Sequence, residues 1–202
     1  MKRSYEMPAG TDPNQYLMVP YIKGRATCQS KNIVESFKIL EQEIAEPVNI
    51  IEIGTNHGGY TLFLNDLKFE KKVHSFDIHK LALHGEELLE QEGVRFYKMD
   101  ALKKGRPIIE TILKEPKKCL LFCDGGNKVL EFKTFGPLLK VGDLIFAHDY
   151  FRTPQDLDET IWKWCETTEA DLKETCEKAN LEPYHQDAFA KSVWAARIRT
   201  KI

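Results

Sequence analysis

The stretch Glu52-Ile53-Gly54-Thr55-Asn56-His57-Gly58-Gly59 follows an apolar run and precedes a helix-compatible segment. Gly54 and Gly58 lack a Cβ, so a ligand can approach the backbone closely at this turn. The helix that begins beyond the turn offers free N–H donors. Dinucleotide-binding turns have two closer glycines that admit a pyrophosphate, and that spacing is absent here. We therefore expect a nucleoside ligand without a pyrophosphate; a strand-to-helix turn without any ligand is the alternative.

Short apolar runs alternate with helix-compatible stretches on both sides of this turn. The expected strands are 48–53, 73–76, 94–97, 119–123 and 144–147. The expected helices are 31–46 with Ser30 as N-cap, 60–69, 80–92, 107–114 and 129–140. Such alternation predicts an α/β, Rossmann-like doubly wound fold, with a mostly parallel sheet covered by helices on both faces. Right-handed connections place the carboxyl ends of the strands along one edge, where ligands bind.

The last quarter of the chain has a different pattern. Apolar residues recur at helical spacing from Ile161 to Ala179, which predicts one long amphipathic helix. The segments His185–Phe189 and Ser192–Arg199 are strand-like and predict a terminal antiparallel hairpin. Residues 1–30 contain several prolines and glycines and are interpreted as an irregular N-terminal segment, a candidate lid. Residues 31–202 then form a single domain.

Composition limits the classes of function. The 202 residues carry 29 Lys plus Arg against 31 Asp plus Glu, so the net charge of −2 gives no bulk attraction to nucleic acid or anionic membrane. No apolar run is long enough to span a bilayer, and no secretory signal is visible. The five cysteines lack metal-type spacing, and Cys119 and Cys123 are expected to be buried thiols. We expect a cytoplasmic protein, and the apolar first helix is compatible with a homodimer.

Acidic residues close four successive apolar runs: Glu52, Asp77, Asp100 and Asp124. An acid at the position of Asp77 can accept hydrogen bonds from both hydroxyls of a ribose. Asp100 is placed to receive an adenine amino group, and Glu52 suits the cationic end of a methionyl sulfonium. A single Asp at a strand end is more often a cap or turn residue, but four in succession indicate one ligand.

These motifs resemble those of class I S-adenosylmethionine-dependent methyltransferases. Glu52-x-Gly54-x-x-x-Gly58, with Thr55 and Asn56 inside it, resembles the first motif of the family. Asp77-Ile78 resembles its ribose-binding acid and Asp100-Ala101 its adenine contact. The resemblance implies S-adenosyl-L-methionine as cofactor, seven strands in the order 3-2-1-4-5-7-6, and a C-terminal antiparallel hairpin.

The next two runs resemble the small-molecule O-methyltransferase branch of that family. Leu121 to Asn127 and Gly142 to Tyr150 are similar to segments of catechol, caffeoyl-CoA and macrolide-sugar O-methyltransferases and of cephalosporin hydroxylase. Many members hold a divalent metal, usually Mg²⁺, with an Asp after the fourth strand and an acidic pair after the fifth. The resemblance assigns Asp124, His148 and Asp149 as metal ligands and Asp124 also as a cofactor contact.

A metal at this position would lower the pKa of an acceptor hydroxyl. The histidine departs from the pattern of the branch, because nitrogen suits manganese, iron or zinc better than magnesium. His148 is alternatively a general base. Lys128 is a second candidate base if its pKa is depressed, and otherwise a surface lysine that opens a helix. Asp124, His148 and Lys128 are thus the candidate catalytic residues.

The function expected from these residues is O-methylation of a small hydroxyl-bearing molecule, assisted by a divalent metal. A nucleic-acid or protein acceptor is disfavoured by the net charge and the lack of a basic run. The alternatives from another class are a metal-dependent hydroxylase-like enzyme, for which iron would suit the histidine, and a non-catalytic nucleoside-binding module. Arg25 and Gln29 are candidate lid contacts. The tryptophans Trp162, Trp164 and Trp194 are expected in the core or at an interface.

Overall fold

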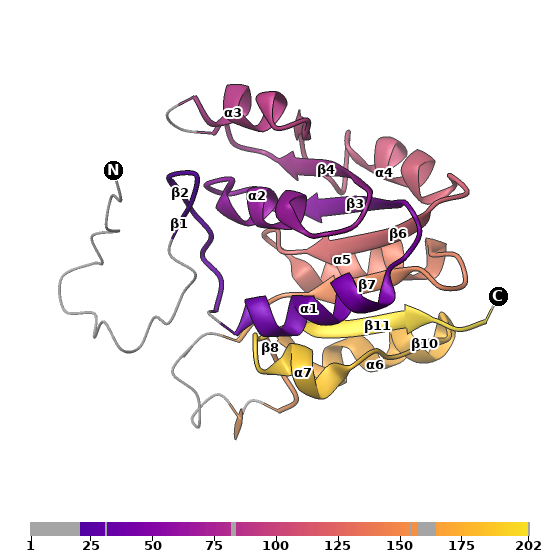
Figure 1. Ribbon diagram of the computed structural model, residues 1–202. Coiled ribbons are helices and arrows are strands. Elements are labelled where there is room, and N and C mark those ends of the chain that lie inside the picture. The colour runs from indigo at the N-terminus through magenta and orange to yellow at the C-terminus, as the bar shows by residue number, and fades with distance from the viewer. Residues whose placement is uncertain (1–20, 31, 82–83, 154, 157–164, 202) are drawn as a thin grey trace.

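The computed structural model describes residues 21–30, 32–81, 84–153, 155–156 and 165–201. Its centre is a seven-stranded sheet in the order β5-β4-β3-β6-β7-β11-β10 (Figure 1). The strands are β3 (Val48–Ile53), β4 (Lys71–Asp77), β5 (Arg95–Lys98), β6 (Lys118–Cys123), β7 (Leu144–Ala147), β10 (Leu181–Pro183) and β11 (Ala195–Arg199). Counted along the chain within this sheet, the order is 3-2-1-4-5-7-6, as predicted. The first five strands are parallel, and β11 runs antiparallel to both β7 and β10.

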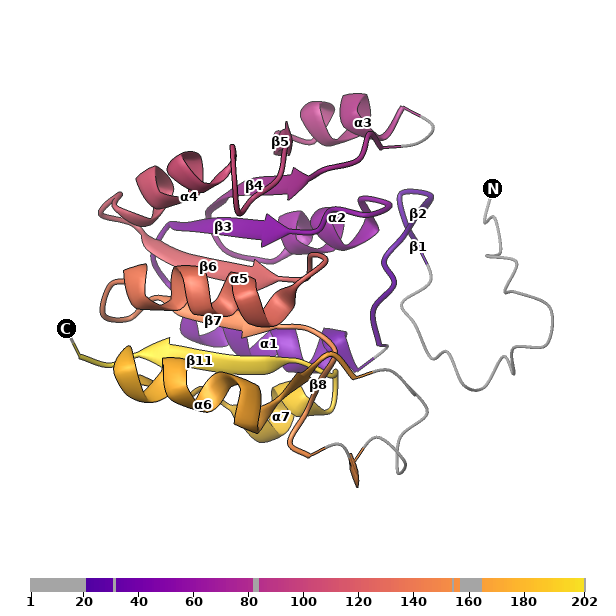
Figure 2. The same ribbon diagram turned by 180° about the vertical axis from the view of Figure 1, so that it is seen from behind.

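Helices cover both faces of the sheet (Figures 1 and 2). One face carries α1 (Ile33–Glu43), α2 (Gly59–Asp66), α3 (Gly85–Gln91) and α7 (Gln186–Ala190). The other face carries α4 (Arg106–Leu113), α5 (Lys128–Phe135), a 3₁₀ turn η1 (Gly136–Leu138) and α6 (Glu169–Lys178). Every residue of β3 is buried, because helices pack on both sides of it. A strand buried on both faces is apolar along its length, which is why these strands were visible in the sequence.

Three expectations about local structure were wrong. Helix α1 begins at Ile33 with Asn32 rather than Ser30 as its N-cap residue. Of the expected helix 161–179, the described residues from Cys165 onward form a helix only in α6, which begins at Glu169; Ile161, Trp162 and Trp164 lie outside the described residues. The segment expected as the first hairpin strand, His185–Phe189, contains helix α7, and the strand that pairs with β11 is β10.

Two small strand pairs were not predicted. Strands β1 (Tyr21–Ile22) and β2 (Arg25–Ala26) form an antiparallel pair before α1. Strands β8 (Tyr150–Phe151) and β9 (Thr167–Thr168) form a parallel pair after β7. The second pair matters for the site, because it brings residues near 166 back beside the end of β7.

Other expectations from composition can be compared with the fold. Cys119 and Cys123 are buried free thiols, as expected. The apolar face of α1, which made a homodimer plausible, packs inside the chain through Ile33, Phe37 and Leu40. Within the described part of the chain, every helix is too short or too polar to span a bilayer.

Candidate active site

The glycine turn connects β3 to α2 and packs against Asp124, the residue that follows β6. Gly54 has φ of +99°, a left-handed conformation that side chains rarely adopt. A Cβ placed on Gly54 would lie 2.2 Å from the carbonyl oxygen of Asp124, so only glycine fits between the two strand ends. Gly58, with φ of +83°, is the N-cap residue of α2. The backbone of the turn therefore lies at the carboxyl edge of the sheet, close to Asp124.

A cavity of about 690 Å³ lies at this edge, a volume suited to a nucleoside-sized ligand. The predicted cofactor contacts Gly54, Asn56, Asp77, Ile78, Asp100, Ala101 and Asp124 all line it. Asp77 is fixed by the turn, since its carboxylate accepts hydrogen bonds of 2.8 Å from the backbone N–H groups of Asn56 and His79. Seven of the residues that the sequence assigns to one ligand therefore line the same cavity.

Three other predicted contacts do not line the cavity: Glu52, Thr55 and Gly58. Glu52 is fully buried, and its carboxylate accepts hydrogen bonds from the hydroxyls of Thr61 and Ser75. Burial raises the pKa of Glu52 to about 8. Thr55 is also buried and hydrogen-bonds to Ser75. Glu52 and Thr55 therefore stabilise the turn through buried hydrogen bonds and do not line the cavity.

Asp124, His148 and Asp149 form a compact cluster beside the cavity, here called the carboxylate–histidine cluster. One potential ligand atom from each lies within 4.8 Å of the others. His148 Nδ1 is 2.9 Å from Asp124 Oδ1 and 3.6 Å from Asp149 Oδ1. Two carboxylates and one imidazole form a donor set that suits a divalent transition metal, and the two carboxylates also suit Mg²⁺. The residues therefore fit the metal that the resemblance implies.

The backbone sets the geometry of this cluster. His148 and Asp149 follow β7 directly, and Asp124 follows the neighbouring strand β6. Asp149 has φ of +52°, an uncommon conformation for a residue with a side chain, which often accompanies function. Its carbonyl oxygen accepts hydrogen bonds from the backbone N–H groups of Glu166 and Thr167. The β8–β9 segment therefore anchors Asp149 in place.

Electrostatics favour a positive charge within the cluster. Burial opposes protonation of His148, but Asp124 and Asp149 outweigh it and raise the pKa of the imidazole. Lys128 lies in the same environment, with Nζ 3.1 Å from Asp149 Oδ2 and 2.6 Å from Glu166 Oε2. Burial alone would lower the pKa of Lys128, yet Asp124, Asp149 and Glu166 together raise it.

This environment corrects the interpretation of Lys128. Its side chain is only 7% exposed, so it is not a surface lysine. Its raised pKa keeps the ammonium protonated, whereas a general base needs a depressed one. Lys128 therefore acts as a fixed cation in this structure.

Gln29 links the N-terminal segment to the cluster. Its side-chain amide donates a hydrogen bond of 3.0 Å to Asp124 Oδ2 and accepts one of 3.0 Å from Trp194 Nε1. Trp194 is fully buried and packs against the His148 ring, with the ring centroids 4.5 Å apart. Gln29, expected as a lid contact, thus orients Asp124, and Trp194 is the core residue that was expected.

Glu131 lines the cavity but was not singled out in the sequence. It lies on α5 and accepts hydrogen bonds from the backbone N–H groups of Gly125 and Asn127. Burial raises its pKa to about 7. The sequence signal was its position one helical turn beyond Asn127, the N-cap residue of α5. Glu131 holds the loop that carries Asp124.

Comparison with known families identifies the chain. The sequence model of the FtsJ-like methyltransferases matches residues 22–151, well over half of the chain and all of the elements described above up to β8. The chain belongs to the FtsJ-like methyltransferase family. It is an S-adenosylmethionine-dependent methyltransferase. The same chain has no significant match among curated protein sequences.

Solved structures show the same fold in distant proteins. The CmcI-N160 apo-structure has a TM-score of 0.64 at 12% identity, over 100% of this chain and 89% of that one. The CurJ carbon methyltransferase has a TM-score of 0.52 at 12% identity, over 84% and 54%. An O-methyltransferase candidate from Nostoc punctiforme PCC 73102 has a TM-score of 0.52 at 12% identity, over 84% and 57%. These likenesses show the fold and leave the acceptor atom open.

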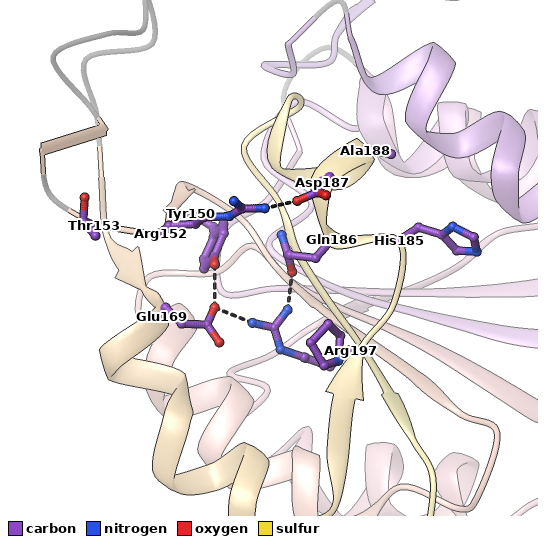
Figure 3. A pocket seen from close by; sticks show the side chains of 10 residues that line it. Tyr150, Arg152, Thr153, Glu169, His185, Gln186, Asp187, Ala188 and Arg197 are labelled. Carbon is purple, nitrogen blue, oxygen red and sulfur yellow. Dashed lines mark hydrogen bonds and ion pairs between the residues drawn. The ribbon is translucent and has the colours of Figure 1, made fainter.

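The methyltransferase has a second cavity, of about 790 Å³, at the lateral edge of the sheet (Figure 3). Its charged and polar groups contact one another. Arg197, which is 1% exposed, pairs with Glu169 and Gln186, and the Tyr150 hydroxyl donates to Glu169. These four residues are here called the lateral cluster. At the mouth of the cavity Arg152 pairs with Asp187. Because its charges are matched in pairs, we interpret the lateral cluster as structural.

Proposed function

We propose that this methyltransferase transfers a methyl group to a hydroxyl oxygen of a small molecule, with a divalent cation held by Asp124, His148 and Asp149. The observation that carries the proposal is the convergence of these three donors beside the cofactor cavity. Asp124 belongs to both, since it lines the cavity and offers a ligand atom to the cluster. A cation held there would lie next to the place where the methyl group is presented.

The cavity residues would bind and orient the cofactor. Asp77 is positioned to accept hydrogen bonds from the ribose hydroxyls, and the segment around Asp100 is positioned to contact the adenine. S-adenosylmethionine supplies a methyl group bonded to a positively charged sulfur. In the reaction the carbon–sulfur bond breaks as the oxygen–carbon bond forms, and S-adenosylhomocysteine remains. Positioning of the two reactants supplies much of the rate enhancement.

The hydroxyl proton must go to a base near the acceptor. A bound divalent cation would lower the pKa of the hydroxyl. Where Asp124 and Asp149 hold the cation without the imidazole, His148 in its neutral form is the chain's candidate base, because the pKa of Lys128 is raised. Asp124 accepts the hydrogen bond from His148 Nδ1 and would stabilise the imidazolium after proton transfer.

A small acceptor is supported by charge. The net charge of −2 offers no general attraction to the phosphates of a nucleic acid. The second candidate function is a metal-dependent hydroxylase-like reaction, favoured by the imidazole in the cluster, because iron accepts a nitrogen ligand readily.

Calorimetry tests the proposal. S-adenosylhomocysteine should bind to the wild-type protein, and Mg²⁺ or Mn²⁺ should bind with an affinity that the Asp149→Ala variant loses. Methyl transfer from labelled S-adenosylmethionine to a panel of catechols and sugars then identifies the acceptor class. Cofactor binding without any divalent-cation binding would contradict the metal-assisted mechanism. Tightly held iron in the purified protein, with no methyl transfer, would favour the hydroxylase-like candidate.

A further inference from the structure

Lys128 is the buried cation of the active site. Its ammonium lies 3.1 Å from Asp149 Oδ2, 3.9 Å from Asp124 Oδ1 and 2.6 Å from Glu166 Oε2. It also donates a hydrogen bond of 3.1 Å to the carbonyl oxygen of Gly125. Lys128 is the first residue of α5, directly after the N-cap residue Asn127, so the start of the helix determines where its side chain enters the cluster.

The ammonium and a divalent cation would share the same carboxylates. Asp124 and Asp149 are two of the three residues whose donor atoms converge in the carboxylate–histidine cluster. Three carboxylates face one ammonium, so negative charge exceeds positive charge whether His148 is neutral or protonated. The site can therefore accept further positive charge. Two cations within a few ångströms of each other nevertheless repel, and burial makes this repulsion stronger than it would be in water.

Glu166 distinguishes Lys128 from a cation that enters from solvent. It is the nearest carboxylate to the ammonium, yet it is not part of the carboxylate–histidine cluster. Its backbone N–H donates a hydrogen bond of 3.0 Å to the carbonyl oxygen of Asp149, which fixes its position relative to the cluster. Lys128 thus has one strong partner that is not needed for metal coordination.

We propose that Lys128 is an internal counter-ion that competes with the divalent cation for Asp124 and Asp149, with Glu166 as the partner that retains it. This inference rests on the metal site of the proposed function. Lys128 neutralises the carboxylates when the cation is absent and sets how tightly the cation binds. It is a positioning and affinity-determining residue rather than a base.

Titration of MnCl₂ into the metal-free protein, followed by calorimetry, tests the inference. Lys128→Met removes the competing charge at nearly constant side-chain length and should tighten Mn²⁺ binding by about tenfold or more. Glu166→Gln removes the retaining partner and should weaken Mn²⁺ binding several-fold, because the ammonium then depends on Asp124 and Asp149. Lys133→Met is the matched control, since Lys133 is an exposed residue of the same helix. Its Mn²⁺ affinity should match that of the wild type.

A thermal melt supplies a second measurement. Without metal, Lys128→Met should melt at a lower temperature than the wild type, because its buried carboxylates lack a counter-ion. Mn²⁺ should raise its melting temperature by more than that of the wild type. If Lys128→Met does not fold without metal, Lys128→Gln, which removes the same charge and keeps a polar side chain, should show the same tighter Mn²⁺ binding, and unchanged binding in that variant would overturn the competition.

The outcomes separate this inference from the proposed function. Equal Mn²⁺ binding by the wild type and Lys128→Met would overturn the competition while leaving the metal site intact. Mn²⁺ binding by Lys128→Met alone would support the competition and show that the natural protein keeps its lysine instead of a metal. Binding by neither protein would overturn both the competition and metal assistance, without affecting the binding of S-adenosylhomocysteine.

Discussion

Two clusters of charged side chains, each with a buried cation, differ in their balance of charge. The carboxylate–histidine cluster ends at Asp149, and the lateral cluster begins at Tyr150. In the lateral cluster one guanidinium, that of Arg197, faces one carboxylate, that of Glu169. At the other, Asp124 and Asp149, together with the neighbouring Glu166, share the single ammonium of Lys128. An unmatched charge is costly to bury. An excess of negative charge at the carboxyl end of a parallel sheet therefore indicates a binding site for a positively charged ligand.

The lateral cavity, of about 790 Å³, is similar in size to the cavity of about 690 Å³ beside Asp124, so volume alone does not indicate which of them is functional. Its polar side chains use their hydrogen-bonding capacity on one another (Figure 3). The cavity beside Asp124 instead presents acids from the ends of adjacent strands. Substitutions in the lateral cluster should therefore affect stability, and substitutions at the carboxylate–histidine cluster should affect ligand binding.

The largest effect is expected for Arg197→Met, which removes a buried guanidinium from Glu169, Gln186 and the carbonyl oxygen of Ala196. The Glu169 side chain is 48% exposed, so solvent screens its unpaired charge, and the free energy of unfolding should fall by about 3 kcal/mol, mainly through the lost hydrogen bonds of the guanidinium. Urea unfolding measures this change. Binding of S-adenosylhomocysteine and Mn²⁺, measured under conditions where the variant is folded, should equal that of the wild type. Loss of either binding would mean that the lateral cluster is part of the functional site.

Gly54→Ala should lower the free energy of unfolding by about 3 kcal/mol, through left-handed strain and the close approach to Asp124. Gly126→Ala is the matched control, because Gly126 lies in the facing loop and no other residue's atoms lie within 4 Å of a Cβ placed there. Urea unfolding and titration with S-adenosylhomocysteine compare the two variants. Equal free energies of unfolding for the two variants would show that the turn does not depend on the close approach of Gly54 to Asp124.

Asp124→Asn should weaken Mn²⁺ binding by about 100-fold, since a neutral amide replaces a charged ligand, while the thermal stability of the metal-free protein stays the same or rises. Arg197→Met is expected to do the reverse, with lower stability and unchanged Mn²⁺ binding. Calorimetry and thermal melts of the same sample measure both quantities. A large fall in stability without a change in Mn²⁺ affinity would make the carboxylate–histidine cluster a structural network like the lateral one.

The smallest effect, taken per pH unit, concerns Glu52, an acid whose pKa rises on folding from about 4.5 to about 8. The folded state binds its proton more tightly, so the stabilisation is complete below pH 4.5 and is lost as the pH rises towards 8. Within this window the free energy of unfolding should fall by up to about 1.4 kcal/mol per pH unit.

Glu52→Gln should flatten that pH dependence, as measured by urea unfolding at several pH values. The control is Glu35→Gln, the same change on an exposed face of α1, which should leave the profile unchanged. A profile of Glu52→Gln that parallels the wild type would show that the buried carboxyl does not govern this pH dependence.

The fold was largely predictable because its central strands are buried on both faces. Such strands appear as apolar runs, and the acids that close them mark the edge of the sheet. The helix 161–179 was overestimated because its apolar spacing continues across Thr167 and Thr168. Thr168 and Asp171 form a capping box that begins α6, and this pattern is visible in the sequence. Recognition of the cap would have corrected the boundary.

The partners within the site were less predictable. Lys128 and Glu166 are 38 residues apart, and their contact depends on the pairing of β8 with β9, two strands of two residues each. No periodicity reveals such short strands. The role of Glu52 was misjudged because the first motif identifies an acid at the strand end without indicating which face of the sheet its side chain joins.

The contact among Gln29, Asp124 and Trp194 has a consequence for the order of assembly. The acid receives its orienting hydrogen bond from a glutamine that is itself held by a tryptophan directly before the last strand, β11. One of the hydrogen bonds that orient this carboxylate therefore depends on the contact between two segments that are 165 residues apart. Truncation of β11 would remove that contact, so damage at the C-terminal edge of the sheet would reach Asp124 through Gln29, although no residue of β11 lines the cavity beside Asp124.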